Sequence, residues 1–238
     1  MKKMFTLHEL IFVIVITVIG FVSIAAVTER NSKEAALTLC ASNMKKLTAA
    51  ATQYAVDNNN TLPGTTYSVG VNWQLRIAPY LGYKNIRPGW NNKAYPIYRC
   101  PLDTAEVPAW VKANAHIAKL SYCANLTLID FDNADANTDR HKGGRKLDDV
   151  AKKDMVILFV ENHTPSMNLR YSAAANCYQK GYTYEYSKQK GTLENDDAKI
   201  GYHDYKNNWA MLDGHVEYMN FEATITPINR WIINRGNL

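Results

Sequence analysis

The sequence KKMFTLHEL at residues 2–10 leads into LIFVIVITVIGFVSIAAV at residues 10–27. Every residue of the second stretch is apolar or small. At about 1.5 Å of rise per helical residue, it spans most of a hydrocarbon core about 30 Å thick. Lys2 and Lys3 precede this stretch, whereas the charges directly after it nearly cancel. The pattern predicts a single membrane-spanning helix with its amino terminus in the cytoplasm and everything after Thr28 outside it.

Glu9 lies at the membrane edge of this apolar run. A carboxylate in low-dielectric surroundings costs several kcal/mol unless a partner neutralises it. If the chain were cut between Met4 and Phe5, the new amino group would lie one helical turn from Glu9, or near the Glu9 of a neighbouring copy. The alternative is a plain signal anchor in which Glu9 extends into the lipid headgroups.

This segment resembles the amino-terminal signal of type IV prepilins and of the pseudopilins of type II secretion. The resemblance implies that a prepilin peptidase cuts after Met4 and methylates Phe5, and that Phe5 then forms a salt bridge with Glu9 of an adjacent subunit. That family has Gly before the cut, where this chain has Met4. The implied partners are other copies or other pseudopilins, the inner-membrane assembly platform and lipid. Removing Lys2 and Lys3 would lower the formal net charge from +5 to +3.

A second resemblance lies near the carboxyl terminus. The segment from His203 to Gly214 fits His-x9-Asp-Gly, the signature of a large family of prepilin-like proteins, and segments 40–45, 78–81, 99–101 and 213–216 agree with that family in order. If residues 206–212 form one straight strand, His203 and Asp213 are about 33 Å apart. We therefore expect Asp213 to stabilise the turn in which it lies, and His203 to form a local hydrogen bond. A catalytic dyad is the less favoured alternative.

The rest of the chain predicts an α+β fold. Apolar residues at spacings of three and four from Leu37 to Tyr54 extend the helix to about Asn58. We expect a short helix at 73–81, a strand within 119–131, a helical turn at 143–152, a buried strand at 155–160, a hairpin around Asp213-Gly214 and a helix from Pro227. The predicted divisions are a leader at 1–4, an assembly helix at 5–28, its continuation at 29–60, and a pilin-like head with a mixed antiparallel sheet at 61–238.

The four cysteines are separated by dozens of residues, without a Cys-x-x-Cys pair. Outside the cytoplasm an even number of cysteines favours disulfides, and three connectivities remain open. Cys40 and Cys100 fall in segments that also carry cysteine in the His-x9-Asp-Gly family. That resemblance implies pairs Cys40–Cys100 and Cys123–Cys177, and unpaired thiols are the alternative.

We find no sequence signature of an enzyme, neither a nucleophile elbow nor a zinc-protease, phosphate-binding or dinucleotide motif. We therefore predict no catalytic residues and no cofactor. The acidic run at 130–139 and the pair Asp196-Asp197 have a composition suited to calcium, but a solvated loop is preferred because the run lacks the EF-hand glycine and glutamate. Glu161, directly after the buried strand, is expected to be half-buried and paired. Basic residues are dispersed, so we do not predict nucleic-acid binding.

Together these features predict a structural subunit of a secretion or pilus filament. Its head would lie in the periplasm or outside the cell. The first alternative is a membrane-anchored binding module for glycan, DNA or secreted cargo, whose aromatic contact residues would be Tyr67, Trp90, Tyr182, Tyr184 and Tyr186. An anchored enzyme comes third, and it would need His203 and Asp213 to converge in a cleft.

Overall fold

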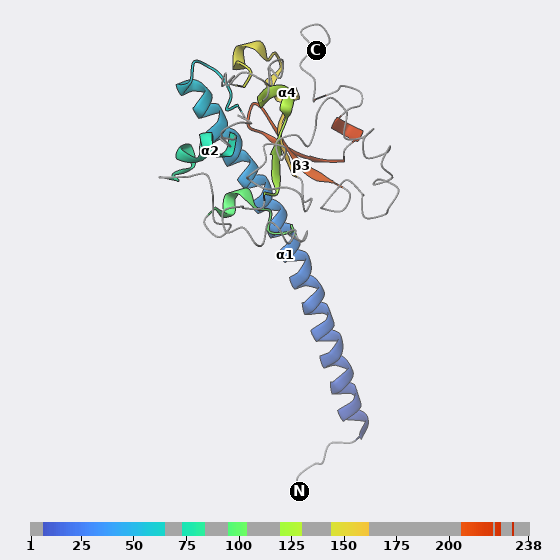
Figure 1. Cartoon of the computed structure of the whole chain (residues 1–238). Coiled ribbons are helices and arrows are strands. Elements are labelled where there is room, and N and C mark those ends of the chain that lie inside the picture. The colour runs from blue at the N-terminus through green and yellow to red at the C-terminus, as the bar shows by residue number, and fades with distance from the viewer. Residues whose placement is uncertain are drawn as a thin grey trace, which may run out of the picture. The chain divides into compact units, whose positions relative to one another are not determined.

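The computed structural model describes residues 7–64, 73–83, 95–103, 120–129, 144–161, 206–220, 222–224 and 230. The chain forms two compact units, Met1–Thr38 and Leu39–Leu238. Its elements follow one another in Figure 1 from one long helix to a small sheet. The predicted carboxy-terminal helix from Pro227 lies outside the described residues, apart from Arg230.

Helix α1 runs from Leu7 to Asp57 without interruption, which confirms the predicted long helix. It ends where the asparagines begin. The side-chain amide of Asn58 donates to the carbonyl of Tyr54 at 2.7 Å, and Asn59 and Asn60 adopt positive φ angles of 53° and 60°. Asparagine tolerates this left-handed conformation better than most residues do, so the asparagine run stops the helix.

The predicted apolar seam faces the core of the second unit. Cys40, Met44, Leu47 and Ala51 are fully buried, and Tyr54 packs at the edge of the same cluster. These residues recur every three or four positions, so they share one face of α1. Helix α1 therefore forms one wall of the core.

Four strands form one antiparallel sheet in the order β1-β2-β3-β4. Their bounds are Tyr122–Ala124, Ile157–Glu161, Asn207–Met211 and Val216–Met219. Every residue of β2 and β3 is buried, so both faces of the central strands are covered. The predicted strand at 155–160 begins later than expected because η4, a 3-10 turn at Lys153–Met155, precedes it. The sheet and the long helix confirm the α+β prediction.

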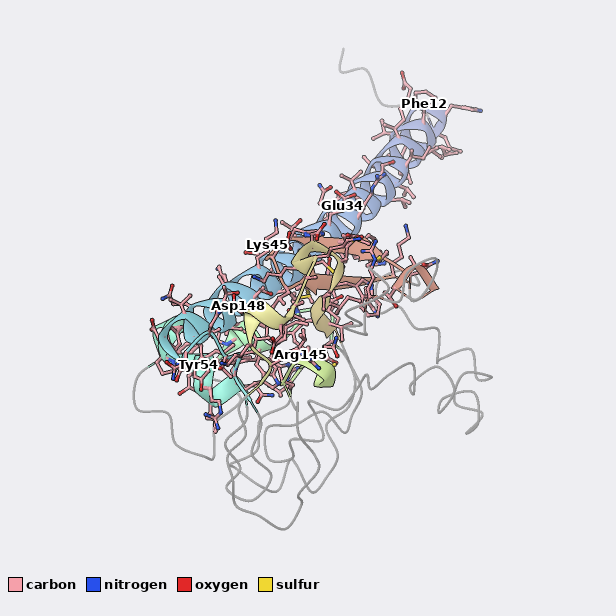
Figure 2. All side chains as sticks on the ribbon, turned by 90° about the horizontal axis from the view of Figure 1, so that it is seen from above. Phe12, Glu34, Lys45, Tyr54, Arg145 and Asp148 are labelled. Carbon is pink, nitrogen blue, oxygen red and sulfur yellow. The ribbon has the colours of Figure 1, made fainter. Side chains whose placement is uncertain are left out.

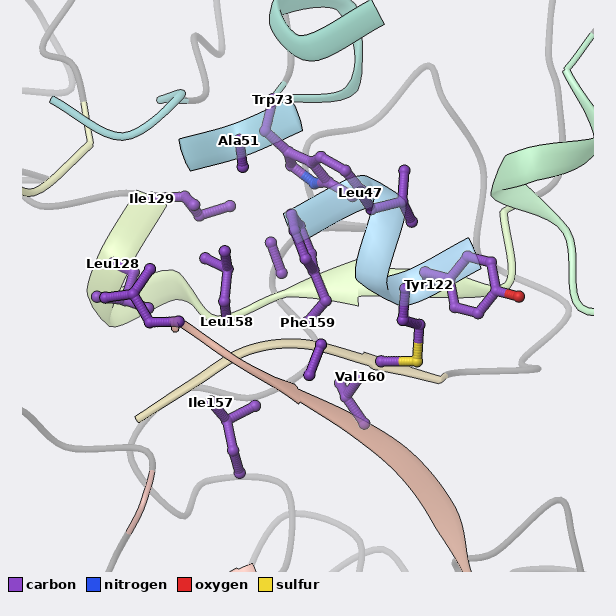
Figure 3. Packing of buried hydrophobic residues seen from close by; sticks show 14 of the residues in the cluster. Leu47, Ala51, Trp73, Tyr122, Leu128, Ile129, Ile157, Leu158, Phe159 and Val160 are labelled. Atoms are coloured by element: carbon purple, nitrogen blue, oxygen red, sulfur yellow. The ribbon is translucent and has the colours of Figure 1, made fainter. Parts of the chain in front are cut away.

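The predicted helix at 73–81 changes type halfway. Helix α2 covers Trp73–Ile77 and continues as the 3-10 helix η1 over Ala78–Leu81. Pro79 has no N–H to donate, and Gly82 ends the segment at φ 82°. The ring of Trp73 packs on Phe159 of β2 at 4.7 Å between centroids. Figure 3 shows both gathered with Leu47 and Ala51 of α1.

Short elements complete the described part of the second unit. They are η2 at Pro96–Tyr98, α4 at Leu126–Ile129, η3 at Leu147–Asp149 and η7 at Glu222–Thr224. The turn η3 falls in the region predicted to be helical at 143–152. The chain before it pairs with the segment after α1, where the N–H of Leu62 donates to the carbonyl of Arg145 at 2.9 Å, and that of Gly144 to the carbonyl of Leu62 at 3.0 Å. These bonds join the end of α1 to the segment before η3.

Candidate functional site

The amino-terminal part of α1 carries an apolar surface that is exposed among the described residues. All described side chains from Leu7 to Ser23 are exposed, and Phe12 and Phe21 are 67% and 74% exposed. Figure 2 shows Phe12 projecting outward from this part of the helix. Within the described residues, α1 is the one helix long and apolar enough to cross a membrane. A surface this apolar needs lipid or another protein to cover it.

The hydroxyl groups in this stretch have partners within the helix itself. Thr17 Oγ1 lies 2.9 Å from the carbonyl oxygen of Val13 and 2.8 Å from that of Ile14, and Ser23 Oγ donates to Ile19 at 2.9 Å. In hydrocarbon an unsatisfied polar group costs several kcal/mol, so such internal bonds make the segment compatible with lipid. At Gly20 an added Cβ would meet nothing within 4 Å. Its small surface leaves room for a neighbouring helix to approach.

Glu9 lies exposed in the first turn of α1. The next charged residue along the chain is Glu29, about 30 Å further on at the helical rise. There the charges balance in exposed pairs, Lys33 with Glu29 and Arg30 with Glu34, each at 3.1 Å. Lys33 and Arg30 therefore pair with acids close to them on the helix, far along its axis from Glu9. Met4 and Phe5 lie outside the described residues.

The predicted Asp-Gly hairpin is confirmed. Strands β3 and β4 pair on either side of a turn in which Gly214 adopts φ 101°, a conformation that favours glycine. Asp213 Oδ1 accepts a hydrogen bond from the backbone N–H of His215 at 3.1 Å. The turn is also tied to η4, because the N–H of Asp213 donates to the carbonyl of Lys153 at 3.3 Å. In the structure Asp213 shapes its turn, and His203 lies outside the described residues.

The histidine that contacts Asp213 here is His215, which we did not predict as a site residue. Its Nδ1 lies 2.7 Å from Asp213 Oδ1, and its Nε2 lies 3.0 Å from Glu217 Oε1. Arg230 Nη1 pairs with the other oxygen of Glu217 at 2.8 Å. The spacing Asp-x-His-x-Glu around a hairpin turn was the signal, since alternate strand residues share one face.

These contacts shift two pKa values in opposite directions. Burial by itself would lower the pKa of His215, but its hydrogen bonds to Glu217 and Asp213 and their negative charges outweigh burial and raise it. Burial would raise the pKa of Glu217, but its hydrogen bonds with His215 and Arg230 lower it. His215 therefore holds a proton more readily than an ordinary histidine, while Glu217 stays ionised to lower pH.

Of the four cysteines, the structure describes Cys40, Cys100 and Cys123, and all three are buried. Ligand atoms of Cys40, Cys100 and Glu161 lie within 4.8 Å of one another. The structure therefore brings the first predicted cysteine pair together without joining it in a disulfide. Cys177, the predicted partner of Cys123, lies outside the described residues, so both pairings stay predictions.

Glu161 is fully buried, although we expected it to be half-buried. The difference arises because β2 includes this residue, and β1 and β3 pair with the strand on both sides. The expected polar pairing is present: Asn208 of β3 donates to both carboxylate oxygens.

An open groove of about 980 Å³ lies beside the head-facing part of α1. Most of its lining is apolar or aromatic, including Leu39, Tyr80, Leu81 and Tyr83. The basic side chains of Lys46 and Arg99 also line it. The five aromatic residues expected for the binding alternative, and both predicted acidic segments, lie outside the described residues. The groove therefore does not test that alternative.

Comparison with family models, with curated proteins and with solved structures finds no match to this chain. What the protein does is therefore inferred from its own residues. Among the predicted site residues, the structure describes Glu9, Asp213, Gly214 and three cysteines, and it brings together only Cys40 and Cys100, with the adjacent pair Asp213-Gly214 in its turn.

Proposed function

We propose that this chain is a structural subunit of the pilin or pseudopilin kind. It is held in the inner membrane by the first part of α1 and assembles through that helix into a filament of the type II secretion or type IV pilus class. One observation carries the proposal: an acid, Glu9, lies in the first turn of a continuous 51-residue helix whose first part is apolar and exposed. The chain itself performs no reaction in this proposal.

The charge of Glu9 explains why pairing between subunits would favour assembly. A carboxylate drawn into the membrane costs at least about 2.5–3.5 kcal/mol at the centre of a membrane-spanning helix, and a cation beside it offsets part of that cost. Cleavage after Met4 would create such a cation at the amino group of Phe5. In a single subunit both charges lie at the same membrane edge. In a filament, the amino group of one subunit would neutralise Glu9 of the next, which favours a defined axial stagger.

The rest of the helix supports packing between subunits. Without a hydrophobic driving force inside lipid, helices associate through close packing and polar contacts. Gly20 offers the small surface that such packing needs. Beyond Leu39, the buried seam fixes the helix to its own head, so that each subunit would carry the head with it into the filament.

The amino terminus of the chain in membranes of its native host tests the proposal. Mass spectrometry should find a chain that begins at N-methylated Phe5. A variant with Met4→Gly should be processed at least as completely, because it restores the residue found before the cut in prepilins. A membrane-bound chain that keeps Met1 in both proteins would identify a plain anchor and overturn the proposal.

A further inference from the structure

Three side chains of kinds that bind metal ions meet in the core of the second unit. Cys40 comes from α1, Cys100 follows η2, and Glu161 ends β2. Their exposed fractions are 0%, 2% and 0%, and one ligand atom from each lies within 4.8 Å of the other two. Such convergence from distant parts of the chain, without access to water, needs a physical explanation.

Burial makes the ionised form of each group costly unless a positive charge is near. A divalent cation would offset most of this cost. Once their three protons leave, the two thiolates and the carboxylate carry three negative charges, the ion supplies two positive charges, and the site keeps a net charge of −1.

We propose that Cys40, Cys100 and Glu161 bind a single zinc ion. Zn–S distances of about 2.3 Å and Zn–O distances of about 2.0–2.2 Å place the ligand atoms of a tetrahedral site about 3.5–3.8 Å apart. Atoms within 4.8 Å of one another therefore reach this geometry by shifts of about 1 Å or less. Two thiolates favour zinc over calcium or magnesium, which take oxygen ligands. Three protein ligands leave the fourth position to a small ligand such as water.

The carboxylate is already oriented for this role. Asn208 donates its backbone N–H to Glu161 Oε2 at 2.8 Å and its side-chain amide to Oε1 at 3.0 Å. These bonds fix the orientation of the carboxylate, as the hydrogen bonds of outer groups do around metal ligands. The ion would join α1, the segment after η2 and the sheet at one point, and would stabilise the folded head over the unfolded chain.

A disulfide between the same two sulfurs is the competing arrangement, since its S–S bond is about 2.05 Å long and excludes a metal between them. It would use two of the three converging groups and would leave the carboxylate of Glu161 buried beside an apolar bridge. The metal uses all three groups, and for this reason we favour it.

The test uses the full chain in detergent, purified without a histidine tag, reducing agent or chelator. Elemental analysis should find one zinc ion per chain, and Cys40→Ser, Cys100→Ser and Glu161→Gln should each lower the zinc content at least tenfold. Two matched controls should retain it: Cys123→Ser, which changes a buried cysteine outside the cluster, and Asp103→Asn, which changes a buried acid held by Ser121.

A second measurement does not depend on whether the variants fold. Replacing zinc by cobalt in the wild-type chain should give thiolate-to-cobalt charge-transfer absorption and the intense visible bands of tetrahedral Co²⁺. A wild-type chain without zinc and without these bands would overturn the proposal. So would a Cys40–Cys100 disulfide found by non-reducing peptide mass spectrometry, or unchanged zinc content in all three ligand variants.

Discussion

Asn208 of β3 donates to both carboxylate oxygens of Glu161 at the end of β2, at 2.8 and 3.0 Å, and both residues lie in the core. A hydrogen bond to a charged or strongly polar group contributes more than a neutral one, and a buried acceptor that loses its donor pays the full cost of desolvation. This contact joins the two central strands of the sheet through side chains as well as through the backbone ladder.

We expect Asn208→Ala to lower the free energy of unfolding of the head by about 1–3 kcal/mol, because the Glu161 carboxylate loses the side-chain amide of Asn208 as a donor. Denaturant unfolding of the full chain in detergent, followed by tryptophan fluorescence, measures this loss. Gln53→Ala is the matched control, since Gln53 is an exposed amide on α1. Equal midpoints for the two variants would show that the contact contributes no stability.

The seam of α1 makes a second prediction. Leu47 is fully buried, whereas Leu39 on the same helix is 49% exposed. Leu47→Ala should cost about 2–5 kcal/mol, because it leaves a cavity beneath the sheet. Leu39→Ala should change the free energy of unfolding by about 0.5 kcal/mol or less. The same unfolding assay compares them, and a loss at Leu39 as large as that at Leu47 would contradict the assignment of the buried face.

The contacts of His215 make a third prediction, which concerns pH. The raised pKa of His215 means that its contribution to stability is complete below the ordinary value of 6.5 and is lost as pH rises through the folded-state pKa. The lowered pKa of Glu217 means that its contribution is complete above the ordinary value of 4.5 and is lost as pH falls through its folded-state pKa. Together they stabilise the hairpin most between these two pH values.

The His215 side chain is 41% exposed, so solvent limits the effect to less than about 1 kcal/mol. We expect the thermal midpoint of the wild-type chain to fall by a few degrees between pH 6 and pH 9, and that of His215→Asn to fall less. His8→Asn, which changes a histidine in the other unit, should retain the wild-type difference. A His215→Asn chain with the full wild-type pH dependence would rule out this histidine as its source.

Local patterns in the sequence were sufficient for the elements that depend on neighbouring residues. The spacing from Leu37 to Tyr54 predicted the buried seam, and Asp213-Gly214 predicted the hairpin, because helix faces and tight turns are decided within a few residues. The start of β2 was misplaced because the 3-10 turn η4 precedes it. This turn follows Lys152, whose φ of 43° is a left-handed conformation that sequence gives little reason to expect of lysine.

Long-range contacts were harder to predict. The convergence of Cys40, Cys100 and Glu161 depends on how α1 packs against the sheet, which no spacing in the sequence encodes. Family resemblance paired the two cysteines but gave no indication of the carboxylate beside them. The full burial of Glu161 was missed for a similar reason, because its strand neighbours come from segments far away in the chain.

A fourth prediction concerns a close backbone approach at Gly144. A Cβ added there would lie 2.7 Å from the carbonyl oxygen of Leu62 and 2.8 Å from that of Leu128. Both atoms belong to the backbone, so the chain must move, and the bond from the Gly144 N–H to Leu62 is weakened. Gly144→Ala should lower the free energy of unfolding by about 1–3 kcal/mol. Gly20→Ala, where a Cβ meets nothing, is the control, and similar stability for the two would refute the prediction.

The last prediction tests the proposed assembly step directly. Glu9→Gln removes the charge but keeps the size of the side chain, so the helix should still enter the membrane, and somewhat more easily. We expect its incorporation into filaments to fall at least tenfold, because the freed amino group of the next subunit loses its counter-charge. A loss of about 1.4 kcal/mol in the subunit contact suffices for that factor.

Glu29→Gln is the matched control, since Glu29 is an exposed acid on the same helix but beyond the apolar stretch, where it pairs with Lys33. It should assemble as the wild-type chain does. Membrane fractionation and the yield of sheared filaments, measured side by side, separate insertion from assembly. If Glu9→Gln chains enter filaments in wild-type amounts, the charge of Glu9 does not direct assembly. If both variants fail equally, the loss reflects the total charge of the helix and not the position of one acid.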